Sequence, residues 1–360
     1  MQATIDPVHA RGQPTRHRLI DEPAAWLGRD LAKRPDLWIE RLSDDDNAEI
    51  AAAVAATQVR GVPIEKIGRE DFPLPTLGSR LDALRKEVVH GRGFVLLRGL
   101  AIADRPIEYA AAAYWGVGTY FGRARSQNSK GHLLGHVRSQ GLSTADPNVR
   151  SYQTTERQTF HIDSCDIVGL LCVRPAKRGG ESKIASSISI YNRMVEERPD
   201  LVDRLFLPMF NDRRGEVPVG AEPWFVIPVF NEYLGYLSVF YIRQYVMSAQ
   251  RFPEVPRLSP ADVEALDYFD RLCDDPAMRL DMTLESGDMQ FLHNHTVVHD
   301  RNAYEDWPER ERKRHLLRLW IAAPDARPLP AAYAQRFGSV TIGDRGGILC
   351  KDTCLHVDLA

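Results

Sequence analysis

The pattern of hydrophobic and polar positions predicts helices in the first third of this chain and short strands in most of the rest. An alanine-rich run at 48–59 follows Ser43 and three aspartates. Acidic residues in a first turn favour a helix because they complement its dipole. A second helix is expected at 76–90, before two glycines, and a third at 107–115. Between them, the apolar run 93–100 is typical of a buried strand.

Short strands dominate after residue 150. Runs of aromatic and β-branched residues between turn residues are typical of antiparallel strands. We expect strands at 167–173, 182–187, 224–246, 289–292 and 315–322. We expect helices at 189–206, interrupted at Pro199, and at 259–273, where Ser259 precedes a proline at the first helical position. The polar segment 122–150 is expected to form a long loop or lid.

This order of elements predicts an α+β fold that is mainly β. The strands are expected to form a double-stranded β-helix (jelly roll) core, with N-terminal and inserted helices packed on it. We divide the chain into an N-terminal arm with helices (1–84), the β-core domain (85–325) and a C-terminal tail (326–360). Residues 1–40 show no sustained period and predict a loosely ordered arm or a peripheral cap.

The amino-acid composition limits which binding partners and which cellular compartment we expect. The chain has 360 residues, a formal net charge of −3 and 26% charged residues, so neither a nucleic-acid nor a membrane-surface partner is expected. No window approaches the ~18 apolar residues of a membrane span. Five cysteines form an odd, sparse set, which fits a reducing cytoplasm better than a disulfide framework. We therefore expect a cytoplasmic protein, and the sequence leaves a homo-oligomer open.

Candidate metal chemistry begins at His161 and Asp163. Residues i and i+2 of a strand project from one face about 6.6 Å apart, so an imidazole and a carboxylate there can converge on one ion. A third ligand is available at His293, His295 or His299, and the spacing alone does not choose between them. Two histidines and one carboxylate are the ligand set of non-heme Fe(II) oxygenases.

Two arginines follow one strand later. Arg314 and Arg318 share a face of the expected strand 315–322. An arginine facing inward needs an anionic partner, because an unpaired buried charge is costly, and its planar guanidinium suits a carboxylate. The other interpretation places Arg314 in the charged surface run 309–314.

At this point the chain resembles a known family. His161-x-Asp163, the distant His299 and the arginine at 314 are similar to the taurine dioxygenase/TfdA family of Fe(II)- and 2-oxoglutarate-dependent dioxygenases, which are clavaminate synthase-like. The segments 93–99, 179–182 and 287–289 add to the resemblance, which covers roughly residues 85–325.

The resemblance implies roles for particular residues. His161, Asp163 and His299 would ligate iron, and Arg314 would pair with the distal carboxylate of 2-oxoglutarate. Ser182 stands where the family often has a threonine that contacts the same carboxylate. Arg318 lies where some members bind an acidic substrate group or the 1-carboxylate of the co-substrate. Four further residues are candidates for substrate contact: Tyr152, Gln153, Asn294 and Trp224.

The implied function is an oxidoreductase that uses Fe(II), 2-oxoglutarate and O2 to oxidise a C–H bond of a small molecule, with succinate and CO2 as co-products. Asp163 favours hydroxylation, or another oxidation without halide such as desaturation, because related halogenases lack that carboxylate. Two alternatives stay open: a zinc-dependent hydrolase with the same His/Asp/His site, and a non-catalytic barrel that binds an oxo acid. The sequence does not identify the primary substrate.

Overall fold

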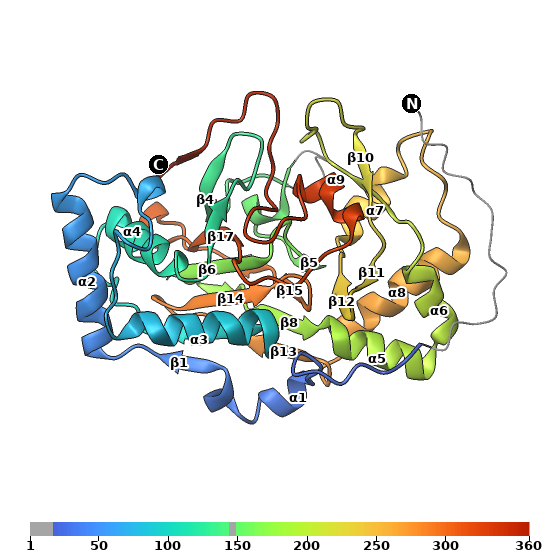
Figure 1. Ribbon diagram of the computed structural model, residues 1–360, viewed down its shortest axis with the longest axis horizontal. Helices are drawn as coiled ribbons and strands as arrows, with labels where there is room; N and C mark the ends of the chain where they lie inside the picture. Colours follow the sequence, from blue (N-terminus) through green and yellow to red (C-terminus); the bar gives the residue numbers. More distant parts are fainter. Residues whose placement is uncertain (1–16, 144–148, 360) are drawn as a thin grey trace.

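Two β-sheets form the centre of the molecule (Figure 1). The structure is a computed structural model that describes residues 17–143 and 149–359. The larger sheet runs in the order β1 (Ile39–Arg41), β2 (Phe94–Arg98), β14 (Met289–His293), β6 (Ile167–Arg174), β17 (His315–Ala322), β4 (His132–Val137) and β18 (His356–Val357), and β3 (Arg123–Arg125) also pairs with β17. The pairs β1–β2 and β18–β4 are parallel, and the other pairs are antiparallel.

The smaller sheet carries the candidate metal ligands. It runs in the order β13 (Arg279–Met282), β8 (Ser182–Ser186), β15 (Val297–Arg301) and β5 (Gln158–His161). Phe94 and Leu292 of the larger sheet share one buried apolar cluster with Ile184 and Leu280 of the smaller sheet. The two sheets therefore pack on each other as the double-stranded β-helix that the sequence predicts. Three short two-stranded pairs join the remaining strands: β9 (Phe210–Asp212) with β10 (Trp224–Val226), β11 (Phe230–Tyr233) with β12 (Tyr236–Val239), and β7 (Arg178–Gly179) with β16 (Tyr304–Glu305).

Helices cover the two sheets from opposite ends of the molecule (Figure 1). The α-helices are α1 (Gly28–Leu31), α2 (Asp44–Val59), α3 (Leu77–His90), α4 (Ile107–Gly118), α5 (Ser187–Glu197), α6 (Pro199–Leu205), α7 (Arg243–Ala249), α8 (Pro260–Asp274) and α9 (Ala334–Phe337). The short 3-10 helices are η1 (Pro35–Leu37), η2 (Ile64–Lys66), η3 (Ser151–Gln153), η4 (Arg310–Arg312) and η5 (Ala331–Tyr333). Helices α2, α3 and α4 bury one cluster with Phe291 and Leu317 of the larger sheet. Helices α5, α6 and α8 bury another with Val298 of the smaller sheet.

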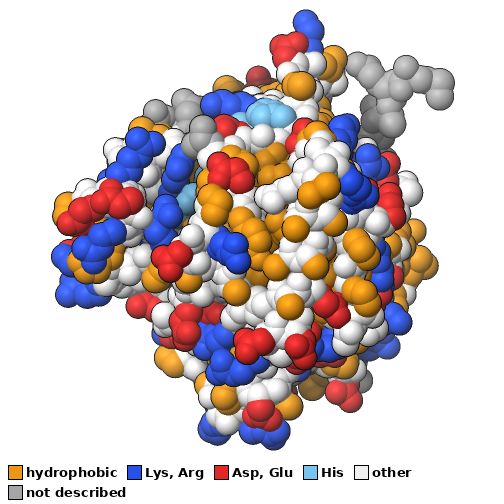
Figure 2. All heavy atoms as spheres, turned by 90° about the vertical axis from the view of Figure 1, so that its left-hand side faces the viewer, with side chains coloured by type: hydrophobic (Ala, Val, Ile, Leu, Met, Phe, Trp, Pro, Cys, Tyr) orange, Lys and Arg blue, Asp and Glu red, His pale blue; other side chains and the backbone are white. Residues whose placement is uncertain are grey.

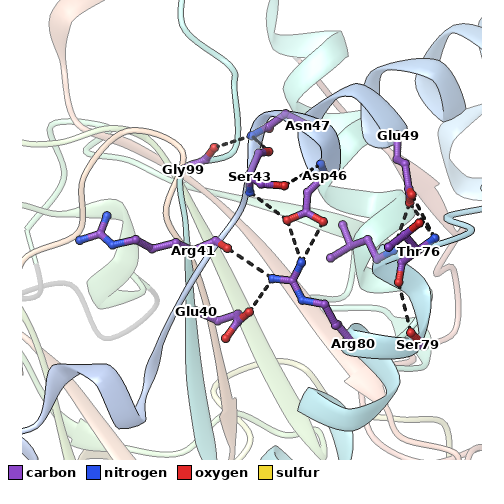
Figure 3. Close-up of polar contacts among 11 residues, drawn as sticks. Glu40, Arg41, Ser43, Asp46, Asn47, Glu49, Thr76, Ser79, Arg80 and Gly99 are labelled. Carbon is purple, nitrogen blue, oxygen red and sulfur yellow. Dashed lines mark hydrogen bonds and ion pairs between the residues drawn. The ribbon is translucent and has the colours of Figure 1, made fainter.

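A polar network fastens the first helices to the larger sheet (Figure 3). Ser43 and Asp46 cap α2 reciprocally, with backbone-to-side-chain bonds of 3.1 and 2.8 Å. Arg80 of α3 reaches Asp46 at 2.8 Å and Glu40 of β1 at 2.5 Å. An N-terminal cap of this kind stabilises a helix by about 1 kcal/mol. The acidic start of α2, visible in the sequence, therefore also joins α3 to β1.

Two expectations about local structure were wrong. The segment 122–150 contains β3 and β4, and β4 pairs with β17 inside the larger sheet. Its strand signal is weak in the sequence because Gly135 and His136 separate the apolar positions Leu134 and Val137. The strands expected up to residue 246 end earlier, and α7 begins at Arg243. Part of the expected loop, 144–148, lies outside the described residues.

Both ends of the described chain contribute to the core. In the N-terminal part, Trp26 and Trp38 are buried against the sheets, so residues 17–41 pack more closely than a loose arm. In the C-terminal part, Tyr333 and Phe337 are buried, and the fully buried Arg345 pairs with Asp166 at 2.7 Å. The proposed division of the chain at residues 84 and 325 stays a prediction.

The surface bears mixed charge. Figure 2 shows acidic and basic side chains intermixed around apolar patches on the face that α2 occupies. None of the helices in the described part of the chain combines the length and hydropathy that a bilayer crossing requires.

Candidate active site

Three side chains that could bind a metal converge between β5 and β15. His161 ends β5, Asp163 follows two residues later, and His299 lies on β15 directly opposite His161 in the antiparallel register. Side chains opposite each other on paired strands are neighbours. One ligand atom from each residue lies within 4.8 Å of the others, and all three residues are buried. The structure therefore brings together two imidazoles and one carboxylate from distant parts of the chain.

The other two candidate histidines face elsewhere. His293 ends β14, and a turn separates it from β15, so the three histidines do not lie on one straight strand. His293 shares a 2.9 Å hydrogen bond with Thr296. His295 donates to Asp166 at 3.0 Å. Both are fully buried, and neither belongs to the group that contains His299.

The imidazoles of His161 and His299 are in the neutral form that can bind a cation. The Nδ1 of His161 donates to the carbonyl of Thr159 at 2.8 Å, which leaves Nε2 as an electron-pair donor. Burial lowers the pKa of His161. Burial, with the charge of His161, lowers the pKa of His299 to about 3. Neutral imidazole is the form that ligates a metal, so this donor set fits a divalent ion such as Fe(II).

Asp163 is held as a carboxylate. Burial is the largest single influence and raises its pKa, but the charge of Arg318 together with the neighbouring His299 and His161 outweighs burial, and the net pKa is lowered. Arg318 lies 3.3 Å from the Asp163 carboxylate. The backbone N–H of Asp163 donates to Asn294 at 3.0 Å. Asn294 is expected from the sequence to contact substrate, but the structure places it behind Asp163, where its amide positions the ligand loop.

The cavity around these residues has two lobes. An inner lobe is lined by Ser182, Arg301 and Arg314 together with the metal group, which is the set of His161, Asp163 and His299. An outer lobe is lined by Arg150, Arg214, Glu216, Tyr245 and Arg336, among others. Both lobes are also lined by Tyr152, Gln158, His161, Asp163 and Arg318. The metal group therefore lies where the two lobes meet.

Arg314 gives the inner lobe a buried positive charge. The residue is 5% exposed, and its Nη1 has no hydrogen-bond partner in the part of the chain that the structure describes. Among the described residues, Arg314 makes no ion pair within 4.0 Å. Burial lowers the pKa of its guanidinium. The alternative of a surface position is therefore wrong. A buried guanidinium without an anion is costly, so the inner lobe fits a carboxylate, and Ser182 adds a hydroxyl to the same lobe.

The sequence analysis missed Arg301, which braces the wall of the inner lobe. It lies two residues after His299 on β15 and donates to the carbonyls of Ser151, Thr154 and Glu156. Burial and the nearby charge of Arg314 lower its pKa to about 10. The strand period of two was a signal that could have found it.

The other three residues that the sequence predicts to contact substrate lie in three different places. Tyr152 lines both lobes, with the Arg318 guanidinium 4.9 Å from its ring. Gln153 lines a neighbouring outer hollow and bonds Gln140 at 3.1 Å. The structure does not bring Trp224 to either lobe. It lies on β10, packs against Phe252 and lines a neighbouring hollow that shares Glu216 and Arg336 with the outer lobe, so a contact of Trp224 with substrate stays a prediction.

Buried neutral histidines predict a strong pH dependence of stability. The pKa values of His299 and His315 are lowered from 6.5 to about 3, and that of His293 falls well below its ordinary value. The unfolded chain therefore binds more protons between about pH 6.5 and pH 3. We expect the free energy of unfolding of the metal-free protein to fall as the pH falls from about 7 to 4. Each histidine contributes up to about 1.4 kcal/mol per pH unit.

Urea unfolding at pH 7, 6 and 5 measures this dependence. The variant His315→Gln should show a shallower slope, because one proton-binding site is removed from the unfolded state alone. A free energy that stays constant or rises toward pH 5 would contradict the expectation.

The comparisons with known proteins agree with this geometry. The model of the family "Taurine catabolism dioxygenase TauD, TfdA family" matches residues 58–320. FR-33289 synthase of Streptomyces rubellomurinus (strain ATCC 31215) is 32% identical over 304 residues, which cover 82% of this chain and 88% of that protein. A uridine-5'-phosphate dioxygenase of Amycolatopsis sp is 30% identical over 185 residues, or 49% of this chain and 65% of that protein.

Solved structures share the fold. Asparagine oxygenase in complex with Fe(II), 2S,3S-3-hydroxyasparagine and succinate gives a TM-score of 0.60 at 18% identity, with 79% of this chain and 93% of that chain covered. The non-heme iron oxygenase OrfP in complex with Fe and alpha-ketoglutaric acid gives a TM-score of 0.57 at 16% identity, with the same coverage. At these identities the likeness concerns the fold. The family match and the relative of 32% identity decide the classification: this chain belongs to the TauD/TfdA family and is an Fe(II)- and 2-oxoglutarate-dependent oxygenase of a small molecule.

Proposed function

We propose that this protein hydroxylates a C–H bond of a small molecule, with iron held by His161, Asp163 and His299. The observation that carries the proposal is the position of these three donors at the junction of two lobes. One lobe has Arg314, a buried cation that makes no ion pair within 4.0 Å among the described residues and that a co-substrate carboxylate would neutralise. The other remains for the molecule that is oxidised.

Arg314 and Ser182 are proposed to bind 2-oxoglutarate in the inner lobe. A guanidinium can hold a carboxylate through two parallel hydrogen bonds, and the Nη1 of Arg314 lacks any partner that would have to be displaced. Leu170, Leu284 and Leu316 line the same lobe. Their apolar surface excludes water and strengthens the attraction between the arginine and the carboxylate.

Arg318 is placed to act between the lobes. It contacts Asp163 and also bonds Gln127 at 2.8 Å, and it lines both cavities. We propose that its charge keeps Asp163 ionised for metal binding and offers further donors to an acidic group of the co-substrate or the substrate.

When bound, iron and 2-oxoglutarate supply the oxidising chemistry: O2 and 2-oxoglutarate are consumed, succinate and CO2 are released, and one oxygen atom enters the substrate C–H bond. The residues of this chain orient the two organic molecules and exclude water. A carboxylate at position 163 supports hydroxylation rather than halogenation. The name of the relative uridine-5'-phosphate dioxygenase supports a small-molecule substrate. The buried free thiols Cys165, Cys172 and Cys273 support a reducing cytoplasm.

Anaerobic titration of the metal-free protein with Fe(II) and then 2-oxoglutarate tests the proposal. We expect the weak visible charge-transfer band of the iron–2-oxoglutarate chelate, followed by succinate formation when O2 is admitted. Tight metal binding without the band or succinate would overturn the proposal. Zinc-dependent hydrolysis that needs no 2-oxoglutarate would establish the alternative enzyme class.

A further inference from the structure

We propose that the segment 336–348 clamps the loop that carries Asp163 and so fixes this residue for metal binding. We call this segment, which begins in α9, the C-terminal clamp. Arg345 and Gly346 are its positioning residues: both lie against the loop, and neither lines the inner or the outer lobe. The inference rests on the proposed function, because it takes Asp163 as a metal ligand. The clamp follows residue 320, where the match to the family model ends.

The loop that carries Asp163 crosses from one sheet to the other. It leaves β5 of the smaller sheet after His161 and enters β6 of the larger sheet at Ile167. The residues between belong to no strand or helix, so their buried backbone groups need partners from other parts of the chain. Asn294 supplies two of them on one side: it accepts from the N–H of Asp163 at 3.0 Å and donates to the carbonyl of Cys165 at 3.1 Å.

The backbone of the C-terminal clamp holds the other side of the loop. The N–H of Gly347 donates to the carbonyl of Ser164 at 2.8 Å. Gly346 packs so closely that a Cβ atom there would lie 2.9 Å from the same carbonyl oxygen and 3.0 Å from the Cα of Cys165. Its φ of 83° lies in the left-handed region that favours glycine. A side chain at position 346 would therefore displace the loop or the clamp.

A buried ion pair fixes the far end of the loop. Asp166 and Arg345 are both fully buried, and the Nε and Nη2 of Arg345 each lie 2.7 Å from the Oδ1 of Asp166. The Nη2 also donates to the carbonyl of Arg327 at 2.6 Å. The other described groups that bond this carboxylate are the N–H of Ala323 and the imidazole of His295, whose pKa burial lowers. Arg345 is thus the only cation among them.

These contacts act on the metal group over a short stretch of chain. Asp163 lies one residue before Ser164 and three before Asp166. A metal ligand has to be held within about 0.5 Å of its productive position, and changes to the groups that orient ligands cost roughly 10–100-fold in metal affinity. Because the clamp holds both Ser164 and Asp166, it limits where the carboxylate of Asp163 can lie.

The test measures binding of Co(II) to the metal-free protein, because the visible absorption of Co(II) reports its coordination geometry and needs no 2-oxoglutarate. Gly346→Ala is expected to weaken Co(II) binding about tenfold or more and to change the spectrum. Gly343→Ala is the matched control. Its φ is 78°, but a Cβ atom there would meet only the Cα of Pro324, at 3.7 Å. Both variants therefore strain the backbone, and only Gly346→Ala pushes on the loop.

A second pair of variants tests the buried ion pair. Arg345→Lys keeps a positive charge beside Asp166 but loses the rigid fork of donors, so we expect about tenfold weaker Co(II) binding with a changed spectrum. Arg327→Lys is the matched control, because Arg327 is also a buried arginine near the C-terminus but pairs with Glu22 at 3.0 Å. It is expected to lower the midpoint of thermal unfolding and to leave Co(II) binding unchanged.

Two outcomes would overturn the inference. One is Co(II) binding in Gly346→Ala and Arg345→Lys that equals binding in their controls. The other is an equal loss in all four variants, which would show a general effect on stability. Circular dichroism establishes that each variant is folded, and if one fails to fold, the other pair decides, because the two pairs change different contacts.

Failure of the proposed function is separate from these outcomes. It would appear in the wild-type protein as the absence of the charge-transfer band with Fe(II) and 2-oxoglutarate, before any variant is made. Absence of Co(II) binding by the wild-type protein would overturn both proposals.

Discussion

Replacing His299 with alanine is expected to abolish tight Fe(II) binding and to reduce succinate formation by at least about 100-fold. The variant leaves His161 and Asp163 as the only protein donors of the group, and two ligands hold a catalytic ion poorly. Changes merely to the partners of metal ligands already cost roughly 10–100-fold. The fold should survive, because among the described residues the Nδ1 of His299 has no hydrogen-bond partner that the substitution would leave unpaired.

The matched control for this experiment is His295→Gln. His295 is also buried and lies only four residues earlier, but it bonds Asp166 instead of facing the metal group. Glutamine keeps a donor for Asp166. We expect this variant to retain the charge-transfer band with Fe(II) and 2-oxoglutarate. A band that persists in His299→Ala and disappears in His295→Gln would show that the ligand assignment is wrong.

Replacing Arg314 with glutamine is expected to weaken 2-oxoglutarate binding by about 100-fold or more while iron binding persists. A buried, charge-assisted pair is worth several kcal/mol when one partner is removed, and each 1.4 kcal/mol corresponds to about tenfold in affinity. The dissociation constant follows from titration of the charge-transfer band.

The same variant should not destabilise the metal-free protein. Arg314 is buried without an anionic neighbour within 4.0 Å among the described residues, so its removal relieves a desolvation cost. Thermal unfolding without ligand should therefore show an unchanged or higher midpoint. Arg312→Gln is the control, because Arg312 belongs to the same charged run but its side chain is 49% exposed. Equal loss of affinity in both variants would refute a specific role for Arg314.

Elements with strong local signals could be predicted from the sequence. The acidic start and alanine run of α2, the cap of α8 and the apolar runs of β2, β6 and β17 depend on neighbouring residues alone. Each appears in the structure within a few residues of its expected bounds. In contrast, β4 becomes a strand because β17 offers it hydrogen-bond partners. A strand that depends on pairing with a distant strand is only weakly indicated by the hydrophobic pattern of its own residues.

For the three metal ligands too, the sequence indicated one part and the tertiary structure decided the rest. His161 and Asp163 are two residues apart, so their shared face was visible in the sequence. The third ligand was not decided by spacing, since His293, His295 and His299 all have odd numbers. The turn between β14 and β15 and the register of β15 against β5 place His299 opposite His161. Family resemblance indicated this residue in advance, and the fold supplies the physical reason.

The sequence by itself determined the fold class, the family and the close pair of metal donors, because local periodicity and short motifs carry that information. Only the tertiary structure decided what surrounds them. Arg150, Glu216 and Arg336 lie far apart in the chain, and the outer lobe exists only because distant loops and α9 pack together. Burial is a property of that packing, so neither the buried position of Arg314 nor the set of residues that lines the outer lobe could be derived from residue order alone.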